Sequence, residues 1–165
     1  IIEAFNIPVY QVSKYEADDV IGTLAKKAEQ AGFTTYMMTS DKDYGQLVSE
    51  NIFIYRPGRG GAEADILGVP EVCEKFGVER VEQVIDLLGM MGDAVDNIPG
   101  LSKVGPVKAN KILEGCDNNN KRKAAVINAY KQHYGDQWKP YLLANGRLIH
   151  IWRHINDHFQ IKEER

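Results

Sequence analysis

The first third of the chain alternates between apolar stretches and stretches with helical spacing. Residues 7–12, 33–39 and 51–55 are rich in apolar and β-favouring side chains, a pattern that predicts three strands. Residues 16–32 place apolar side chains at helical spacing and end at a glycine, which predicts a helix, and residues 41–48 predict a shorter one. This βαβαβ order implies a largely parallel sheet flanked by helices.

Beyond residue 62 the pattern predicts helices only. The basic, glycine-rich stretch 56–62 separates the two parts and indicates a hairpin or a surface loop. Helical spacing is found over residues 70–76, 81–91, 121–134 and 140–153, with a helix-turn-helix unit over 98–115. The last helix carries an apolar stripe typical of a core-facing helix, formed by Trp138, Tyr141, Leu142, Leu148, Ile149 and Trp152. We therefore expect an α/β part over residues 1–69 and an all-helical part over 70–165.

The composition limits the classes of protein to which the chain can belong. A chain of 165 residues with 44% hydrophobic residues suits one domain, or one domain with a small appended module. No apolar run reaches membrane-spanning length and no signal peptide is visible, so we expect no membrane partner. Cys73 and Cys116 stand far apart without metal-type spacing, which suits a reducing, cytoplasmic compartment. The chain begins at Ile1 rather than at a methionine, which indicates a fragment or a processed piece.

Charge is distributed unevenly along the chain. The net charge of −3 argues at first against a nucleic-acid partner. Residues 99–123, however, contain only Glu114 and Asp117 as acidic residues, against six basic ones: Lys103, Lys108, Lys111, Lys121, Arg122 and Lys123. Such a local surplus of positive charge is typical of a surface that binds phosphate.

Seven acidic residues form three short clusters, each where an apolar stretch gives way to a turn or a helix start. They are Glu16, Asp18 and Asp19 in YEADDVIGTLA, Asp41 and Asp43 in TSDKDYGQLV, and Asp93 and Asp96 in MGDAVDNIPG. Carboxylates placed in this way can converge at one edge of a sheet, where ligands bind in parallel-sheet proteins. Because like charges in one site need compensation, hard divalent cations are expected there. Two such ions, roughly 3.5–4 Å apart, would clamp a phosphodiester and activate water.

Each cluster also has a simpler structural interpretation. Glu16 and its neighbours begin a predicted helix, where acidic residues serve as caps and oppose the helix dipole. Ser40 or Asp41 could cap the following short helix in the same way. Asp93 and Asp96 are three residues apart and would face one direction on a helical turn. Three such clusters in one short chain favour a shared metal site over three separate caps.

Residues 98–113 form a further motif, IPGLSKVGPVKANKIL. Apolar side chains surround a hairpin closed by Gly105, and Pro106 suits the first turn of the helix that follows. The free amides of this helix start, together with close backbone approach at Gly105, would allow a phosphate to bind. The pattern predicts a helix-hairpin-helix, which grips the DNA backbone without reading its sequence. The expected DNA-binding residues are Gly100, Lys103, Gly105, Lys108 and Lys111.

Three histidines offer a competing metal motif. His150, His154 and His158 recur every four residues, a spacing that can place imidazoles on one helical face. Only the first two are expected to be helical, and no cysteine or acidic cluster joins them except Asp157. An exposed or packing role is therefore favoured over zinc binding.

In combination, these motifs resemble the 5′-nuclease (flap endonuclease) family. EADDVIGTLA, TSDKDYGQLV and LLGMMGDAVDNIPG, followed by the helix-hairpin-helix, look most like the 5′→3′ exonuclease domain of bacterial DNA polymerase I, over about residues 1–115. The resemblance implies an α/β, PIN-like or resolvase-like nuclease core with a parallel sheet, followed by an all-α helix-hairpin-helix region. It also implies hydrolysis of DNA phosphodiesters in replication and repair, on 5′ flaps and on nicked or branched duplexes.

The resemblance further implies which residues hold metal. The family uses two divalent ions, normally Mg²⁺, with Mn²⁺ able to substitute. Glu16 and Asp18 would hold the first ion. The second would be held, directly or through water, by Asp19, Asp41, Asp43, Asp93 and Asp96. In the family the hairpin, here around Gly105, often carries a potassium ion on its carbonyl groups.

The sequence departs from the family pattern at both ends. It lacks the family's N-terminal part, with two further aspartates and a helical arch, so we expect the isolated chain to be weak or inactive. The missing strands would leave apolar sheet surface exposed, which favours dimerisation or aggregation. Residues 118–165 look more like the closing segment of phage exonucleases of the family. Whether a polymerase domain is covalently linked in the parent protein therefore stays an open question.

Two other functions remain open at this point. A module that holds duplex DNA through the hairpin without chemistry would need no metal at Asp41, Asp43 and Asp93. A Toprim-like phosphotransfer domain also pairs a glutamate with a downstream DxD, but GDAVDN joined to a helix-hairpin-helix is not expected there. We expect a metal-dependent, structure-specific nuclease of a bacterial or phage-infected bacterial cell.

Overall fold

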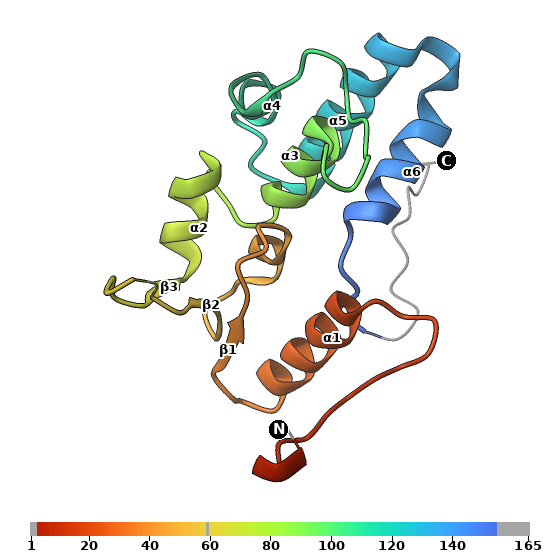
Figure 1. Ribbon diagram of the computed structural model, residues 1–165. Coiled ribbons are helices and arrows are strands. Elements are labelled where there is room, and N and C mark those ends of the chain that lie inside the picture. The colour runs from red at the N-terminus through yellow and green to blue at the C-terminus, as the bar shows by residue number, and fades with distance from the viewer. Residues whose placement is uncertain (1–2, 59, 155–165) are drawn as a thin grey trace.

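The computed structural model describes residues 3–58 and 60–154, and its N-terminal part joins a small sheet to one long helix (Figure 1). The elements in chain order are η1 (Glu3–Phe5), α1 (Ala17–Gln30), β1 (Thr35–Met38), η2 (Asp43–Leu47), β2 (Ile52–Arg56) and β3 (Asp65–Leu67). The predicted helix at 16–32 and the predicted strands at 33–39 and 51–55 are confirmed. The short helix predicted at 41–48 is a 3₁₀ helix.

The sheet has the strand order β1–β2–β3 and is mixed rather than wholly parallel. β1 and β2 are parallel, with Thr35 beside Ile52, whereas β3 runs antiparallel to β2, with Leu67 beside Ile54. The glycine-rich stretch therefore lies within a hairpin, and the prediction of helices only beyond residue 62 is wrong. A strand of three residues is too short for its alternation to be recognised in the sequence.

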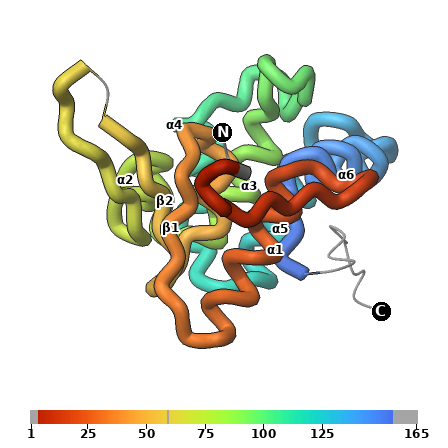
Figure 2. The backbone as a smooth tube through the Cα atoms, turned by 60° about the horizontal axis from the view of Figure 1, so that its bottom comes forward, coloured from red at the N-terminus to blue at the C-terminus, as the bar shows by residue number. Residues whose placement is uncertain are grey.

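Residues 7–12 do not form the predicted first strand. Within the described part of the chain β1 pairs only with β2, and the segment before α1 arches away from the sheet (Figures 1 and 2). Its apolar side chains are exposed, Val9 by 66% and Tyr10 by 67%. A strand needs a partner for its backbone groups, so an apolar stretch alone does not form one. Among the described residues no strand pairs with the outer edge of β1, and its Tyr36 and Met38 side chains are exposed.

The C-terminal part is helical, with α2 (Val69–Phe76), α3 (Gln83–Met91), α4 (Pro106–Leu113), α5 (Asn119–Tyr134), η3 (Gly135–Gln137) and α6 (Trp138–Ile149). The helices predicted at 70–76, 81–91 and 121–134 are confirmed. Residues 98–105 are not helical, because Gly100 and Lys103 take left-handed backbone angles, with φ of 58° and 61°. The hairpin therefore lies between α3 and α4.

The last predicted helix differs from the prediction in two ways. It ends at Ile149 rather than at residue 153. Of its apolar stripe, Leu142 and Ile149 are buried as predicted, but Leu148 is 66% exposed and Tyr141 is exposed as well. Successive side chains on a helix point about 100° apart, so Leu148 and Ile149 cannot both face the core.

The core of the helical part is built around α3, which packs against α4, α5 and α6. Its Leu87 and Leu88 are fully buried. Tyr130 of α5 is also fully buried, and its hydroxyl donates to the carbonyl oxygen of Gly89 at 2.6 Å and accepts from Nδ2 of Asn145 at 2.9 Å. A satisfied polar network of this kind fixes the three helices in one arrangement.

The residues that follow α6 return to the sheet-bearing part. Gln46 of η2 donates through Nε2 to the carbonyl oxygen of Ile149 at 2.8 Å and accepts at Oε1 from the N–H of Ile151 at 3.1 Å. A Cβ atom on Gly22 of α1 would lie 2.6 Å from the carbonyl oxygen of Trp152, so the two backbones are in contact. The end of the helical part is thereby held against α1 and η2. Among the described residues, no helix combines the length and apolar character needed to cross a bilayer.

Candidate metal centre and nucleic-acid interface

The predicted acidic residues meet at one cavity of about 550 Å³ between α1, η2 and the end of α6. Six of the seven line it: Glu16, Asp18, Asp19, Asp41, Asp43 and Asp96. Residues 147–152, which include Arg147 and His150, line the cavity too, and so does Lys14. Segments far apart in the sequence therefore build a single acidic pocket.

Asp93, the seventh, belongs to a tighter group within this region. One carboxylate oxygen from each of Asp43, Asp93 and Asp96 lies within 4.8 Å of the others. This acidic trio joins the start of η2 to the loop 92–100. Its spacing suits carboxylates that share one hard cation.

The loop 92–100 is closed by two glycines packed against each other. The N–H of Asp93 donates to the carbonyl oxygen of Ile98 at 2.8 Å, and the N–H of Ile98 donates back at 2.7 Å. A Cβ atom on Gly92 would lie 2.3 Å from the oxygen of Ile98, and one on Gly100 would lie 2.4 Å from the nitrogen of Gly92. Both glycines also have positive φ. The close backbone packing that holds Asp93 in place therefore requires glycine at both positions.

Charges within the trio are unevenly compensated. Burial, followed by repulsion from Asp41, raises the pKa of Asp43 from 3.8 to about 6. Nζ of Lys42 lies 2.6 Å from Oδ2 of Asp93, and this hydrogen bond lowers the pKa of Asp93. Oδ1 of Asp43 is buried and has no hydrogen-bond partner among the described residues. A buried, unpaired carboxylate oxygen beside two further carboxylates fits the donor set of a hard divalent cation.

The neighbouring carboxylates are held by hydrogen bonds. Tyr44, which is buried, donates its hydroxyl to Oδ1 of Asp18 at 2.7 Å, and the N–H of Trp152 donates to Oδ1 of Asp19 at 2.9 Å. Oδ1 of Asp41 accepts from the N–H of Asp43 at 2.9 Å. These bonds fix the direction in which each carboxylate faces the pocket.

The interpretation of the acidic residues as helix caps holds for Asp41, whose Oδ1 accepts from the N–H of Asp43, the first residue of η2, at 2.9 Å. Glu16 is the residue before α1, but its side chain makes no capping hydrogen bond. Lys42 takes the corresponding position before η2, again without a side-chain cap. The acidic residues of the first two clusters all line the shared pocket, Asp41 included.

Three residues of the site were not singled out from the sequence: Lys42, Tyr44 and Arg147. Lys42 and Tyr44 lie within TSDKDYGQLV, where the alternation of acidic and basic residues could have indicated a role for this segment's other polar residues. Arg147 lies far along the chain on α6 and reaches the pocket only through the tertiary fold.

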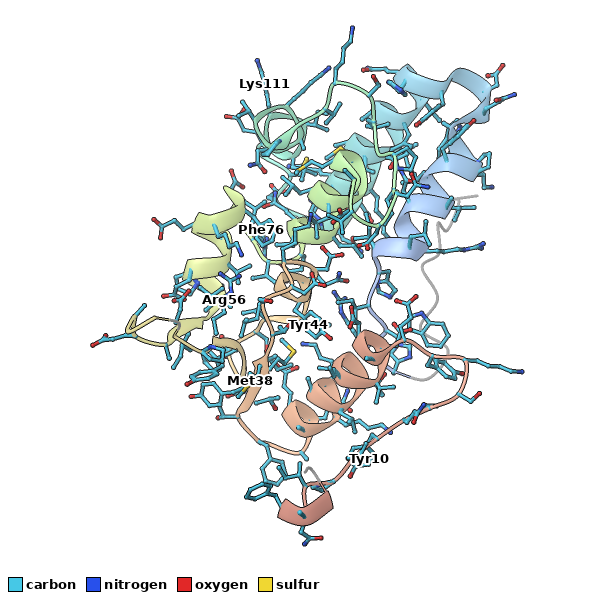
Figure 3. All side chains as sticks on the ribbon, viewed as in Figure 1. Tyr10, Met38, Tyr44, Arg56, Phe76 and Lys111 are labelled. Carbon is cyan, nitrogen blue, oxygen red and sulfur yellow. The ribbon has the colours of Figure 1, made fainter. Side chains whose placement is uncertain are left out.

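The hairpin between α3 and α4 presents its predicted basic residues to solvent. Lys103, Lys108 and Lys111 are exposed, and Figure 3 shows Lys111 pointing away from the body of the protein, far from Tyr44. A Cβ atom on Gly105 would meet nothing within 4 Å, so the backbone before α4 is open to a ligand. Gly100 is buried instead, and its carbonyl oxygen accepts from the hydroxyl of Tyr134 at 2.9 Å.

The histidines do not share a helical face. His150 follows α6 and lines the acidic pocket, and His154 is exposed beyond it. His158 lies outside the described residues. The spacing therefore does not place the imidazoles on one helical face, because α6 ends before His150.

Comparison with known families covers nearly the whole chain. Residues 1–77 match the 5′-3′ exonuclease N-terminal resolvase-like domain, and residues 79–157 match the 5′-3′ exonuclease C-terminal SAM fold. Fold and site thus define a resolvase-like α/β domain, with an acidic pocket, joined to a helical SAM-like domain. The chain belongs to the 5′-3′ exonuclease (flap endonuclease) family.

Its relatives include DNA polymerases and a free-standing exonuclease. DNA polymerase I of Rhizobium leguminosarum is 43% identical over 111 residues, which are 67% of this chain and 10% of the polymerase. A 5′-3′ exonuclease of Aquifex aeolicus is 41% identical over 114 residues, which are 69% of this chain and 38% of the exonuclease. The chain therefore matches only a minor part of these relatives.

Solved structures of bacteriophage T5 enzymes share the fold. One, of divalent metal ions (zinc) bound to T5 5′-exonuclease, has a TM-score of 0.68 at 18% identity, covering 90% of this chain and 54% of that one. Another, of the T5 flap endonuclease in a pseudo-enzyme-product complex with DNA and metal ions, has a TM-score of 0.61 at 15% identity, covering 90% and 65%. At this level of identity the likeness shows a common fold.

Proposed function

We propose that this chain forms the acidic pocket and the DNA-holding hairpin of a metal-dependent, structure-specific 5′→3′ exonuclease or flap endonuclease. The enzyme would hydrolyse DNA phosphodiesters in replication and repair. The observation that supports this most strongly is that carboxylates from three distant segments line one cavity or lie beside it. The membership of the chain in the 5′-3′ exonuclease family supports the same activity.

The acidic trio of Asp43, Asp93 and Asp96 would hold one divalent ion, with Mg²⁺ the natural occupant and Mn²⁺ a substitute. Glu16 and Asp18 would hold a second ion, and Asp19 and Asp41 would contribute to the trio's ion directly or through water. Bound divalent ions would stabilise charge on the scissile phosphate and supply an activated water.

The chain's own residues prepare the pocket for a phosphodiester. Tyr44 and the backbone N–H of Trp152 keep Asp18 and Asp19 oriented, so these carboxylates need little rearrangement when a ligand arrives. Arg147, which also lines the pocket, would offer its guanidinium to a phosphate that enters there.

The hairpin would hold the duplex by its backbone. Exposed lysines and the open backbone at Gly105 suit contacts with phosphate that carry no sequence preference. A potassium ion would bind to the hairpin carbonyls. The substrate would be a flapped, nicked or branched duplex. In the parent protein, a polymerase domain would be covalently linked to this chain.

The catalytic part of the proposal is tested by cleavage of a labelled 5′-flap duplex with Mg²⁺ or Mn²⁺, against EDTA. Any product should require the metal, and Asp43→Ala and Asp93→Ala should abolish it, in this chain or in a longer parent, while duplex binding survives. Cleavage in EDTA, or wild-type turnover in either variant, would remove these residues from the site.

The hairpin is tested by binding titrations of the same duplex over a range of salt concentrations. Replacing Lys103 and Lys108 together with methionine should weaken binding regardless of DNA sequence and flatten the logarithmic salt slope by about 2. Lys26→Met, on α1 and outside the hairpin, is the matched control. An unchanged slope would exclude the hairpin as the backbone grip.

A DNA-binding module without catalysis is the second candidate, favoured by the exposure of the hairpin lysines. Metal-independent duplex binding, with no cleavage under any metal, would select it. The acidic pocket would then have no catalytic role in this chain.

A further inference from the structure

Lys42 stands among the carboxylates of the acidic trio and interrupts them with a positive charge. It lies between Asp41 and Asp43 in the sequence, and its Nζ contacts Oδ2 of Asp93 at 2.6 Å. Among the described residues, Lys42 is the basic side chain that forms an ion pair with a member of the trio.

Both oxygens of Asp93 are already engaged. Oδ1 accepts from the N–H of Val95 at 2.8 Å, and Oδ2 accepts from Lys42. The N–H of Val95 is fixed by the glycine-closed loop, whereas the Lys42 side chain is 42% exposed and can swing into solvent. A cation that binds Asp93 would therefore displace Lys42 from Oδ2 more easily than it would displace the N–H of Val95 from Oδ1.

An ammonium and a divalent ion cannot share this carboxylate without strong repulsion. Their charges would lie within a few ångströms of each other in a partly buried site, where screening by water is weak. Asp43 also favours a cation at this site, because its buried Oδ1 lacks a hydrogen-bond partner among the described residues.

We propose that Lys42 is a tethered counter-ion, which neutralises Asp93 in the metal-free protein and leaves it when a divalent cation enters the acidic trio. The inference rests on the proposed function, since it takes the trio to be a metal site. Lys42 is thus a positioning residue: it holds Asp93 in place before metal arrives, and its competition weakens metal binding.

The test is calorimetric titration of Mn²⁺ into the chain of residues 1–165, in the wild type and in the variants Lys42→Met and Lys42→Arg. Lys42→Met should bind Mn²⁺ about tenfold more tightly than the wild type, because a close charge pair typically contributes enough for such a factor. Lys42→Arg keeps the competing charge and should bind close to the wild type. Lys26→Met removes a comparable ion pair, with Glu29 at 2.9 Å, away from the trio, and should change nothing.

Thermal unfolding gives a second, independent readout. In EDTA, Lys42→Met should unfold at a lower temperature than the wild type, because Asp93 loses its counter-ion. Added Mn²⁺ should raise its unfolding temperature by more than it raises that of the wild type. In the double variant of Lys42→Met with Asp43→Asn, the Mn²⁺ site that Lys42→Met strengthens should be lost, which would place that ion at the trio.

The failures of the two proposals are distinguishable. Equal Mn²⁺ affinity in wild type and Lys42→Met would overturn the counter-ion role and leave the metal site standing. No Mn²⁺ binding in any variant, Lys42→Met included, would overturn the metal site and the counter-ion role with it.

Discussion

The Asp43 carboxylate is partly buried and is repelled by neighbouring carboxylates. Burial and the nearby Asp41 raise its pKa from 3.8 to about 6, although Lys42 partly opposes them. The folded chain therefore binds more protons than the unfolded chain between these two pH values. By linkage, the contribution of Asp43 to the free energy of unfolding falls as pH rises through this window. A bound cation favours the ionised carboxylate, so metal binding should weaken below about pH 6.

Replacing Asp43 with asparagine tests this linkage. In EDTA at neutral pH the variant should be more stable than the wild type by about 1 kcal/mol, because a charge crowded by other carboxylates is removed. The gain should vanish near pH 4, and Mn²⁺ should stabilise the variant less than it stabilises the wild type. Urea unfolding at several pH values measures all three effects. Asp136→Asn, at an exposed position on η3, is the control, and an Asp43→Asn difference that did not change with pH would contradict the assignment.

At the scale of elements, sequence predicts well what is decided locally. α1 was predictable because its helical spacing and terminal glycine are contained in one stretch of chain. The apolar residues 7–12 carry an equally good strand signal, yet a strand forms only with a pairing partner, which the described chain does not supply. The meeting of the acidic clusters followed from strand and turn order. The hydrogen bond from the N–H of Trp152 to the carboxylate of Asp19 joins residues 133 positions apart, and no sequence signal indicates it.

The loop 92–100 gives a prediction that separates packing from ligand binding. Gly92→Ala should cost at least about 3 kcal/mol of stability, because its Cβ would overlap the backbone of Ile98 at a positive φ. Gly105→Ala should change stability by less than about 0.5 kcal/mol, since open space surrounds it and its φ is −95°. It should still weaken duplex binding if backbone approach matters there. Denaturant unfolding and DNA titration of both variants measure the contrast, and similar stability losses would contradict it.

At the scale of the whole molecule, Gln46 joins the two parts of the chain. It is 3% exposed and bonds both Ile149 and Ile151, while its own carbonyl oxygen accepts from Nη2 of Arg153 at 3.0 Å. The wall of the pocket formed by residues 147–152 is therefore fixed to η2, which carries Asp43.

Gln46→Leu should break this connection while conserving most of the side-chain volume. We expect a loss of about 2–4 kcal/mol in stability, because two buried backbone groups lose their partners. Hydrogen exchange should increase at the N–H of Ile151 and at the N–H of Trp152, which holds Asp19. Gln132→Leu, at an exposed position on α5, is the control. Unchanged protection at Trp152 would mean that Gln46 does not support the pocket.

The packed glycines of the loop 92–100 also limit how this chain can be varied. One short stretch of backbone runs from Asp93 and Asp96 directly into the hairpin that ends at Gly105. An inserted or deleted residue between Gly92 and Gly100 would shift the carboxylates and the lysine-bearing hairpin in the same step. Most surface loops tolerate changes of length, but this one should not. The acidic pocket and the hairpin can therefore change independently only by substitution of side chains.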